Sequence, residues 1–323
     1  MLSVIITWRN RLELETSLAH NLPLLEAMRC EWELLVVNGG GDKSLLQSIL
    51  SSTRCPRLRV LDVPQPEFNK SFCINAGVAK SSGDMLLLLD GDILIDASFV
   101  EVISNPLPKD AFLTVKTVVE THPGAPPITA GRTEPFLTEM VQVTTLVGVD
   151  GRSASYEYRC GYDGSRCGPG IIVVHRSHFL GVGGFNSALS GWGFEDYDFH
   201  VRLQFALGLK PNMIASVVHL THAAADAQEV THDHNKGIAY TNYMRRQFLG
   251  TLKQDLAIFA QKSTVETSSR SAPGSMLHSG LGAHTSTSAP TTASHRFRPA
   301  QSIAREAARP RWPEPSTAAL EGV

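Results

Sequence analysis

The first part of the chain alternates short, almost continuously apolar runs with segments whose apolar residues recur at helical spacing. The apolar runs, interpreted as buried strands, lie at 3–7, 33–37, 58–63 and 85–89. The helical patterns lie between them, at 12–28, 44–50 and 71–80. Strands that are apolar throughout need cover on both faces, and strands separated by helices run parallel. The alternation predicts an α/β fold with a mainly parallel central sheet and helices on both faces.

Composition limits the class of protein. Of 323 residues, 42% are hydrophobic, which is enough for a substantial core, and a net charge of −2 gives no electrostatic case for nucleic acid. No apolar run approaches the roughly 20 residues of a membrane helix, and residues 1–7 resemble a buried strand rather than a signal peptide. The five cysteines have no CxxC spacing, which favours reduced thiols over a Cys160–Cys167 disulfide. We expect a cytoplasmic protein without a transmembrane segment.

The composition changes near position 262. From Gln261 to Val323, Ser, Thr, Ala, Pro, Gly and Arg dominate, and hydrophobic periodicity disappears. Such a segment cannot bury enough apolar surface to offset its ordering entropy. We therefore predict one folded domain over residues 1–261 and a disordered tail over residues 262–323.

Polar residues come directly after the first two predicted strands, where parallel sheets bind ligands. Thr7, Arg9 and Arg11 lie at the end of the first strand, and the arginines can hold a diphosphate through charge-assisted hydrogen bonds. The alternative is a helix start with solvated arginines. Asn38, at the tip of the second strand, is a candidate for contacting a uracil or ribose edge. Residues 39–41 lack GxGxxG spacing and are interpreted as a turn without a phosphate role.

Two further groups precede or end predicted elements. Lys70 is placed to reach donor phosphate, and Asn75 to orient a neighbouring loop, although both residue types are common on surfaces and helices. Asp90 and Asp92 come after four leucines at the end of a strand. In an extended chain, residues i and i+2 face the same side, so both carboxylates can meet one divalent ion. An exposed turn is the alternative.

Histidines mark a third group. His219 and His222 lie at the end of the strand-like run 214–220, and imidazole together with carboxylate favours manganese. Their spacing of three places them on opposite faces of an extended strand, so only one binds metal unless the strand has ended. Residues 231–234 are interpreted as a loop or helix cap rather than a metal site.

The segment 191–198 places an aromatic residue between glycines directly before three acids, which open the apolar-periodic run 199–207. Its carboxylates are therefore expected at a helix N-terminus beside a glycine-rich loop. With Asp90 and Asp92, the chain has two acidic clusters, one suited to a metal and one to a base.

These motifs, in this order, resemble those of the β1,4-galactosyltransferases, and the first hundred residues also resemble family 2 glycosyltransferases. The resemblance spans about positions 3 to 222 and implies a GT-A fold, with a nucleotide-sugar half at 1–95 and an acceptor half at 96–261. It rests on residues 7–11, 68–70 with 75–77, 90–92, 183–186 and 191–198.

The resemblance implies roles for single residues. Arg9 and Arg11 match contacts to the nucleotide diphosphate. Asp92 matches the metal-binding acid and His222 the metal histidine, with His219 three residues earlier.

The same resemblance implies that Trp192 is the loop tryptophan that touches donor and acceptor. It also implies that Asp196 is the catalytic base, with Glu195 as its acidic neighbour. Phe194 stands where glycine is usual and Tyr197 replaces an acid.

These features predict a metal-dependent glycosyltransferase that uses Mn²⁺ or Mg²⁺. It moves a hexose or N-acetylhexosamine from a UDP-sugar to a hydroxyl of a glycan or other acceptor, and an Asp base favours inversion. A retaining enzyme of this fold is an alternative. A sugar nucleotidyltransferase would need a glycine-rich loop after the first strand, and a non-catalytic binding protein would not need both acidic clusters. Tyr156, Tyr158 and Tyr162 are candidates for stacking on an acceptor sugar, with packing as the alternative.

Overall fold

The computed structural model describes residues 1–122, 137–191, 193–222 and 228–269, with backbone only at 228–230 and 262–269. All of these residues belong to one compact unit, Met1–Ala272. Within the described ranges, no helix combines the length and the apolar character that crossing a membrane requires.

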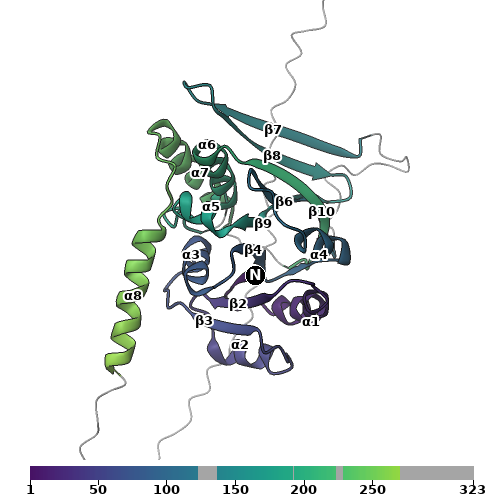
Figure 1. Ribbon diagram of the computed structural model, residues 1–323, viewed down its shortest axis with the longest axis vertical. Coiled ribbons are helices and arrows are strands. Elements are labelled where there is room, and N and C mark those ends of the chain that lie inside the picture. The colour runs from purple at the N-terminus through teal and green to yellow at the C-terminus, as the bar shows by residue number, and fades with distance from the viewer. Residues whose placement is uncertain (123–136, 192, 223–227, 270–323) are drawn as a thin grey trace, which may run out of the picture. The chain divides into compact units, whose positions relative to one another are not determined.

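The elements succeed one another along the chain as Figure 1 labels them. In order they are β1 (Leu2–Trp8), α1 (Glu13–Glu26), β2 (Trp32–Asn38), α2 (Lys43–Leu50), β3 (Leu58–Asp62), α3 (Lys70–Lys80), β4 (Met85–Asp90), β5 (Ile93–Leu94), α4 (Ala97–Ile103), β6 (Ala111–Glu120), β7 (Glu139–Val147), β8 (Ser153–Gly161), β9 (Arg166–His175), α5 (Arg176–Gly181), α6 (Glu195–Leu207), β10 (Lys210–His219), α7 (Gln228–Met244) and α8 (Leu252–Ser269).

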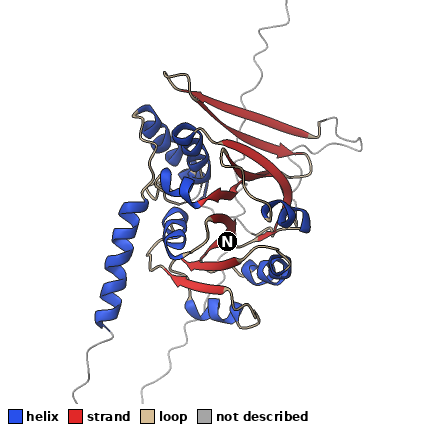
Figure 2. Ribbon diagram, viewed as in Figure 1, coloured by secondary structure: helices blue, strands red, loops and turns tan. Residues whose placement is uncertain are grey.

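The described strands form a ten-stranded sheet with the order β3-β2-β1-β4-β9-β6-β10-β5, and β7 and β8 form a hairpin that joins it through β9. Figure 2 draws the strands in red and the helices in blue. Neighbours from β3 to β4 are parallel, as are β6 and β10. Strand β9 is antiparallel to both β4 and β6. The predicted α/β architecture with a parallel sheet in the first part of the chain is confirmed.

Each face of the sheet has its own hydrophobic core, because successive residues of a strand point to opposite faces. The even-numbered residues of β1, from Leu2 to Trp8, pack with α1, α2 and α4. Ile5 packs on the other side, with α3, α5, α6 and α8. Trp8 is 1% exposed, and its Nε1–H donates to the carbonyl of Arg11, so this tryptophan packs on the sheet. Helices therefore cover both faces, as predicted.

Strand direction determines where polar side chains gather. Because β9 is antiparallel to both β4 and β6, strands β1, β2, β3, β4, β6 and β10 all point the same way. Their carboxyl ends share one edge of the sheet, and β9 begins at that edge. Any site formed by residues at the ends of these strands therefore lies along this edge.

Two predictions about secondary structure need correction, and one part of the chain without a prediction is now assigned. The hairpin β7–β8 and the start of β9 lie in the stretch up to Gly170, which has no clear strand pattern. Residues 231–234 are neither loop nor cap, because they lie inside α7. Helix α8 continues to Ser269, so it crosses the boundary predicted after Gln261. The remaining predicted tail lies outside the described residues. All five cysteines are free thiols, as expected.

Candidate active site

Four charged side chains meet where α3, β4 and α6 come together. Lys70 opens α3, Asp90 ends β4, and Glu195 and Asp196 open α6. Lys70 Nζ lies 3.0 Å from Asp90 Oδ1, 3.3 Å from Asp196 Oδ2 and 3.9 Å from Glu195 Oε1. We call these four residues the acid cluster. Asp196 Oδ1 and Glu195 Oε2 are buried and have no hydrogen-bond partner among the described residues.

Burial sets the electrostatics of the acid cluster. It raises the pKa of Glu195 to about 7, and the neighbouring Asp196 carboxylate adds to this rise. Burial also raises the pKa of Asp196, although the Lys70 ammonium opposes the shift. For Lys70, burial disfavours the charged form, but the carboxylates of Asp196, Asp90 and Glu195 prevail and raise its pKa. The lysine is thus an ammonium, whereas the α6 carboxylates gain basicity.

Gly170, on β9, lies directly against the acid cluster on the side of the sheet. A Cβ at this position would lie 2.9 Å from Asp196 Oδ2 and 3.1 Å from both Asp90 Oδ2 and Lys70 Nζ. No side chain fits there without displacing the charged groups. No sequence signal pointed to this role, because Gly170 lies in the unpatterned stretch of the chain.

A second group of side chains lies at the ends of β4 and β10. His219 Nε2 and His222 Nε2 lie 3.4 Å and 3.0 Å from Asp92 Oδ2. One ligand atom from each of the three residues lies within 4.8 Å of the other two, a spacing that could hold a metal ion. We call Asp92, His219 and His222 the histidine cluster. Three of the four predicted metal ligands are therefore brought together.

The fourth predicted ligand, Asp90, belongs to the acid cluster instead. Strand β4 ends at Asp90, and the next two residues form a turn, so the two-residue periodicity of an extended chain does not apply. Asp90 is therefore not part of the histidine cluster, and its role as a metal ligand stays a prediction. The end of a strand also explains why both histidines reach one carboxylate. Because β10 ends at His219, the chain can turn after it and bring His222 to the carboxylate of Asp92.

His219 has a second carboxylate partner that sequence reasoning missed. Its Nδ1 lies 2.6 Å from Oε2 of Glu120, the last residue of β6. Burial disfavours the imidazolium, but hydrogen bonds to Asp92 and Glu120 raise the pKa of His219. An acid directly after an apolar run was the available signal for Glu120.

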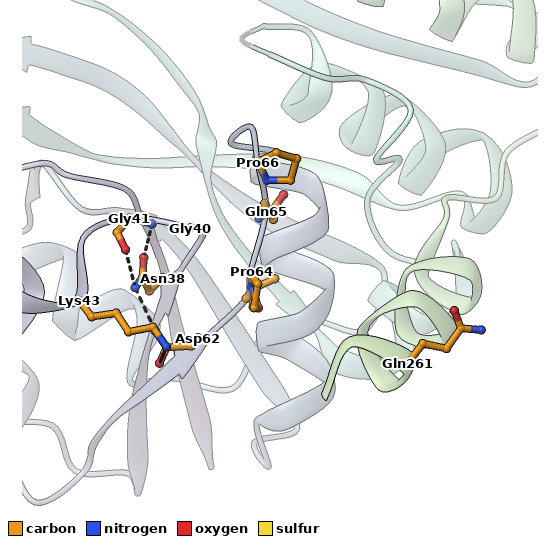
Figure 3. A pocket seen from close by; sticks show the side chains of 10 residues that line it. Asn38, Gly40, Gly41, Lys43, Asp62, Pro64, Gln65, Pro66 and Gln261 are labelled. Carbon is orange, nitrogen blue, oxygen red and sulfur yellow. Dashed lines mark hydrogen bonds and ion pairs between the residues drawn. The ribbon is translucent and has the colours of Figure 1, made fainter. Parts of the chain in front are cut away.

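Asn38, a predicted nucleotide ligand, lines a cavity at the ends of β2 and β3 (Figure 3). Its volume is about 660 Å³, and its lining includes Asn38, Asp62 and Pro66. Asn38 Oδ1 accepts from the N–H of Gly41, and its Nδ2 donates to Gly41 O and Asp62 Oδ1. The Asn38 amide is thus occupied by the protein itself and shapes the cavity floor. Asp62 Oδ2 pairs with Lys43 Nζ at 3.0 Å.

Arg9, directly after β1, borders the same cavity. Arg9 donates from Nη2 to the carbonyl of Pro66, a lining residue. Thr7 lies between Val37 and Asp90 in the sheet. Arg11 is half-buried, and contacts of Thr7, Arg9 and Arg11 with a nucleotide stay predictions.

Asn75, in α3, uses its side chain to hold neighbouring parts of the protein. It is completely buried, its Nδ2 donates to Phe185 O and Asp255 Oδ2, and its Oδ1 accepts from the N–H of Phe185. It therefore orients the neighbouring loop that carries Gly184 and Phe185, which is the role expected from the sequence.

Helix α7 holds the glycine-rich loop before α6. Asn235 Nδ2 donates to the carbonyls of Ser190 and Gly193. A Cβ on Gly193 would lie 2.9 Å from the ring of His232, which in turn contacts the hydroxyl of Tyr158. Trp192, a predicted ligand of donor and acceptor, lies outside the described residues.

Of the three tyrosines proposed for acceptor stacking, Tyr156 is buried and packs with Phe194 and Tyr197. Tyr158 and Tyr162 are half-buried.

Two family models match the chain. Glycosyl transferase family 2 matches residues 3–144, and the model described as the N-terminal domain of galactosyltransferase matches residues 151–226. Chondroitin sulfate synthase 3 of Homo sapiens and of Mus musculus is 39% identical over 57 residues, which are 17% of this chain. The chain spans only 6% of the length of these curated relatives in that match.

Solved structures with weak overall similarity include three glycosyltransferases. S. aureus TarS is 12% identical, with 68% of this chain and 60% of TarS covered and a TM-score of 0.43. Drosophila β1,4-galactosyltransferase 7, solved with manganese, UDP-Gal and xylobiose, is 17% identical, with coverages of 71% and 78% and a TM-score of 0.41. The mannosyltransferase PcManGT from Pyrobaculum calidifontis is 13% identical, with coverages of 83% and 79% and a TM-score of 0.41.

The two family matches divide the site between them. The family 2 match contains Lys70, Asp90 and Asp92, and the galactosyltransferase match contains the start of α6 and both histidines. With glycosyltransferase models over residues 3–144 and 151–226, and with this α/β sheet, the chain has the sequence features and the fold of a GT-A glycosyltransferase.

Proposed function

We propose that this chain transfers a hexose or N-acetylhexosamine from a UDP-sugar to an acceptor hydroxyl, with inversion at the anomeric carbon and with Mn²⁺ as the metal. One observation carries the proposal. Two buried carboxylate oxygens without a partner among the described residues, on Glu195 and Asp196, lie at the same sheet edge as the histidine cluster.

The histidine cluster fits a divalent transition metal. Asp92 offers a carboxylate oxygen, and His219 and His222 each direct Nε2 toward that oxygen. Two imidazoles with one carboxylate favour Mn²⁺ over Mg²⁺, which prefers oxygen ligands. Asp92, His219 and His222 would hold the ion, which would supply positive charge to the leaving nucleoside diphosphate.

Asp196 is the proposed general base. Its Oδ1 is buried without a partner among the described residues, and burial raises its pKa, so the carboxylate accepts a proton more readily than an exposed one. Lys70 Nζ holds the other oxygen, Oδ2, at 3.3 Å and fixes the orientation of the carboxylate. Glu195 is placed to hold acceptor hydroxyls in position.

The donor is proposed to lie between the cavity at β2–β3 and the histidine cluster. The cavity takes the nucleoside, and Arg9, which borders it through Pro66, is positioned for the diphosphate. UDP is the nucleotide implied by the resemblance to β1,4-galactosyltransferases.

The experiment measures donor hydrolysis and transfer over a panel of nucleotide sugars, with Mn²⁺ and with chelator. We expect turnover with at least one UDP-sugar, its loss in chelator and its return with Mn²⁺. Asp196→Asn should lower turnover by roughly 10²- to 10⁴-fold, the usual effect of losing a general base, with nucleotide affinity unchanged by calorimetry. The matched control is Asp110→Asn, at an exposed aspartate away from both clusters.

Different results refute different parts of the proposal. Near-native turnover of Asp196→Asn would place the base elsewhere. Full activity in chelator would refute the metal requirement. The anomeric configuration of the first product, measured by NMR, separates inversion from retention. Release of pyrophosphate from a nucleoside triphosphate and a sugar phosphate would instead identify a nucleotidyltransferase.

A further inference from the structure

Glu120 lies behind the histidine cluster and contacts His219, one of its members. Its Oε2 is 2.6 Å from His219 Nδ1, whereas His219 Nε2, the other ring nitrogen, lies 3.4 Å from Asp92 Oδ2. The imidazole therefore bridges two carboxylates, with one nitrogen directed to each. Glu120 is on the side of the ring away from Asp92.

This contact selects one tautomer of the ring. A carboxylate oxygen can only accept a hydrogen bond, so His219 Nδ1 must carry the proton that Glu120 accepts. In the neutral ring, Nε2 is then without a proton, and its lone pair is directed toward Asp92 and His222. That is the nitrogen a metal ion would require.

The Glu120 carboxylate is itself fixed at both oxygens. Thr221 Oγ1 donates to Oε2 at 2.9 Å, and Arg166 Nε donates to Oε1 at 3.1 Å. The N–H of Thr221 in turn donates to the hydroxyl of Thr121, so the segments after β6 and β10 are tied together. The carboxylate cannot rotate away from His219 without breaking several hydrogen bonds.

We propose that Glu120 is a positioning residue for the metal: it fixes the tautomer and ring orientation of His219 so that Nε2 is available as a ligand. This inference rests on the proposed function, because it assumes that the histidine cluster binds a divalent ion. Carboxylates behind metal-binding histidines commonly act in this way, and their loss weakens metal affinity by about 10- to 100-fold.

The test measures Mn²⁺ affinity by calorimetry on the full chain. Glu120→Ala should raise the dissociation constant by about 10- to 100-fold. Glu120→Gln should raise it less, because the amide oxygen still accepts from Nδ1. The matched control is Glu139→Gln, which removes a carboxylate that pairs with Arg159 on the β7–β8 hairpin and should leave affinity unchanged.

A second measurement separates positioning from a general loss of structure. The ¹⁵N shifts of the His219 ring, recorded without metal at a pH where the ring is neutral, should report a proton on Nδ1 in the wild type. In Glu120→Ala the ring should populate both tautomers, and the melting temperature of the variant shows whether it is folded.

The outcomes distinguish the two proposals. Unchanged Mn²⁺ affinity or an unchanged tautomer in folded Glu120→Ala overturns the role of Glu120, while binding by the wild type and its loss in His222→Ala keep the metal site. Absence of Mn²⁺ binding by the wild type overturns both.

Discussion

Phe194 combines an unfavourable backbone with a favourable side chain. Its φ is 68°, in the left-handed region that glycine favours, at the residue directly before α6. The ring is 2% exposed and makes edge contacts with Tyr156 and Tyr240 at 5.6 Å and 5.9 Å. The left-handed conformation costs a non-glycine residue about 1–2 kcal/mol, and burial of a phenylalanine stabilises by about 1.5–3 kcal/mol. The glycine expected here from the resemblance would remove the cost of the left-handed backbone but would also lose the stabilisation from the buried ring.

Replacing Phe194 should therefore reverse the usual ranking of alanine and glycine. Both Phe194→Ala and Phe194→Gly should destabilise the protein, because each leaves a cavity among aromatic rings. The glycine variant should be the more stable by about 1 kcal/mol, since it alone relieves the left-handed backbone. Urea unfolding of the two variants gives this difference.

Phe185 provides the matched control for this ranking. It is also fully buried, but its φ is not positive, so alanine should be the more stable replacement there. An alanine variant at Phe194 that is as stable as the glycine variant would show that the backbone there carries no strain.

Helix α6 concentrates acids in its first turn, where two effects oppose each other. The helix dipole favours carboxylates at an N-terminus. Burial disfavours them, and for Glu195 burial is the larger effect, since the pKa of its 4% exposed side chain rises to about 7. The start of α6 thus holds its carboxylates in a state that is unfavourable for folding and useful for proton transfer.

This gives a pH dependence of stability with a defined sign. A carboxyl whose pKa rises from 4.5 unfolded to about 7 folded binds more protons in the native state, so its contribution to stability is lost as pH rises between these values. The maximum slope from one such group is about 1.4 kcal/mol per pH unit. Glu195→Gln should flatten the dependence of unfolding free energy on pH from about 5 to about 7, measured by urea titration.

Other groups also titrate in this pH range. Their contributions to the pH dependence of stability cancel when the variant is compared with the wild type. Burial raises the pKa of Asp196 as well, so some slope of the same sign should remain in Glu195→Gln. An identical slope in both proteins would mean that Glu195 titrates near its ordinary pKa.

Strands whose residues are apolar throughout were predictable from the sequence. Strands whose residues are mostly exposed, and which are held by pairing with neighbouring strands, were not. β1, β2 and β4 were found because burial on both faces leaves an unbroken apolar run. β7 was missed because most of its residues are exposed, and Val143 and Val147 face solvent at 58% and 72%.

The same distinction applies to the site. Lys70, Glu195 and Asp196 were recognisable because each lies at the start of a helix with a clear pattern. The position of Asp90 in the acid cluster was not, because the turn that follows it decides which way its carboxylate points.

At the scale of the whole molecule, α8 links the end of the described chain to α3 and to the loop before α6. Asp255 is buried, and its carboxylate accepts hydrogen bonds from Asn75, Ser187 and Thr251. These partners come from α3, from the loop before α6 and from the residue directly before α8. The helix therefore supports the loop that carries Phe185.

Truncation experiments should separate the contribution of α8 from that of the residues after it. Since Met1–Ala272 is one compact unit, a chain ending at residue 272 should unfold in a single transition at an unchanged melting temperature, with donor hydrolysis intact. Asp255→Ala should instead lower the unfolding free energy by about 1–3 kcal/mol, because buried donors lose their acceptor.

The exposed neighbour Gln254→Ala is the control for Asp255→Ala and should leave stability unchanged. A large fall in the melting temperature of the truncated chain would show that residues after 272 contribute to the fold.

The turn Asp90-Gly91-Asp92 has an evolutionary consequence. It belongs at one end to the acid cluster and at the other to the histidine cluster, so a single covalent segment sets the spacing between them. A substitution in the core that shifts β4 moves both carboxylates in the same direction and preserves that spacing. The core residues of the sheet can thus change in sequence while the spacing between the two carboxylates stays the same. An insertion of one residue in this turn would change that spacing.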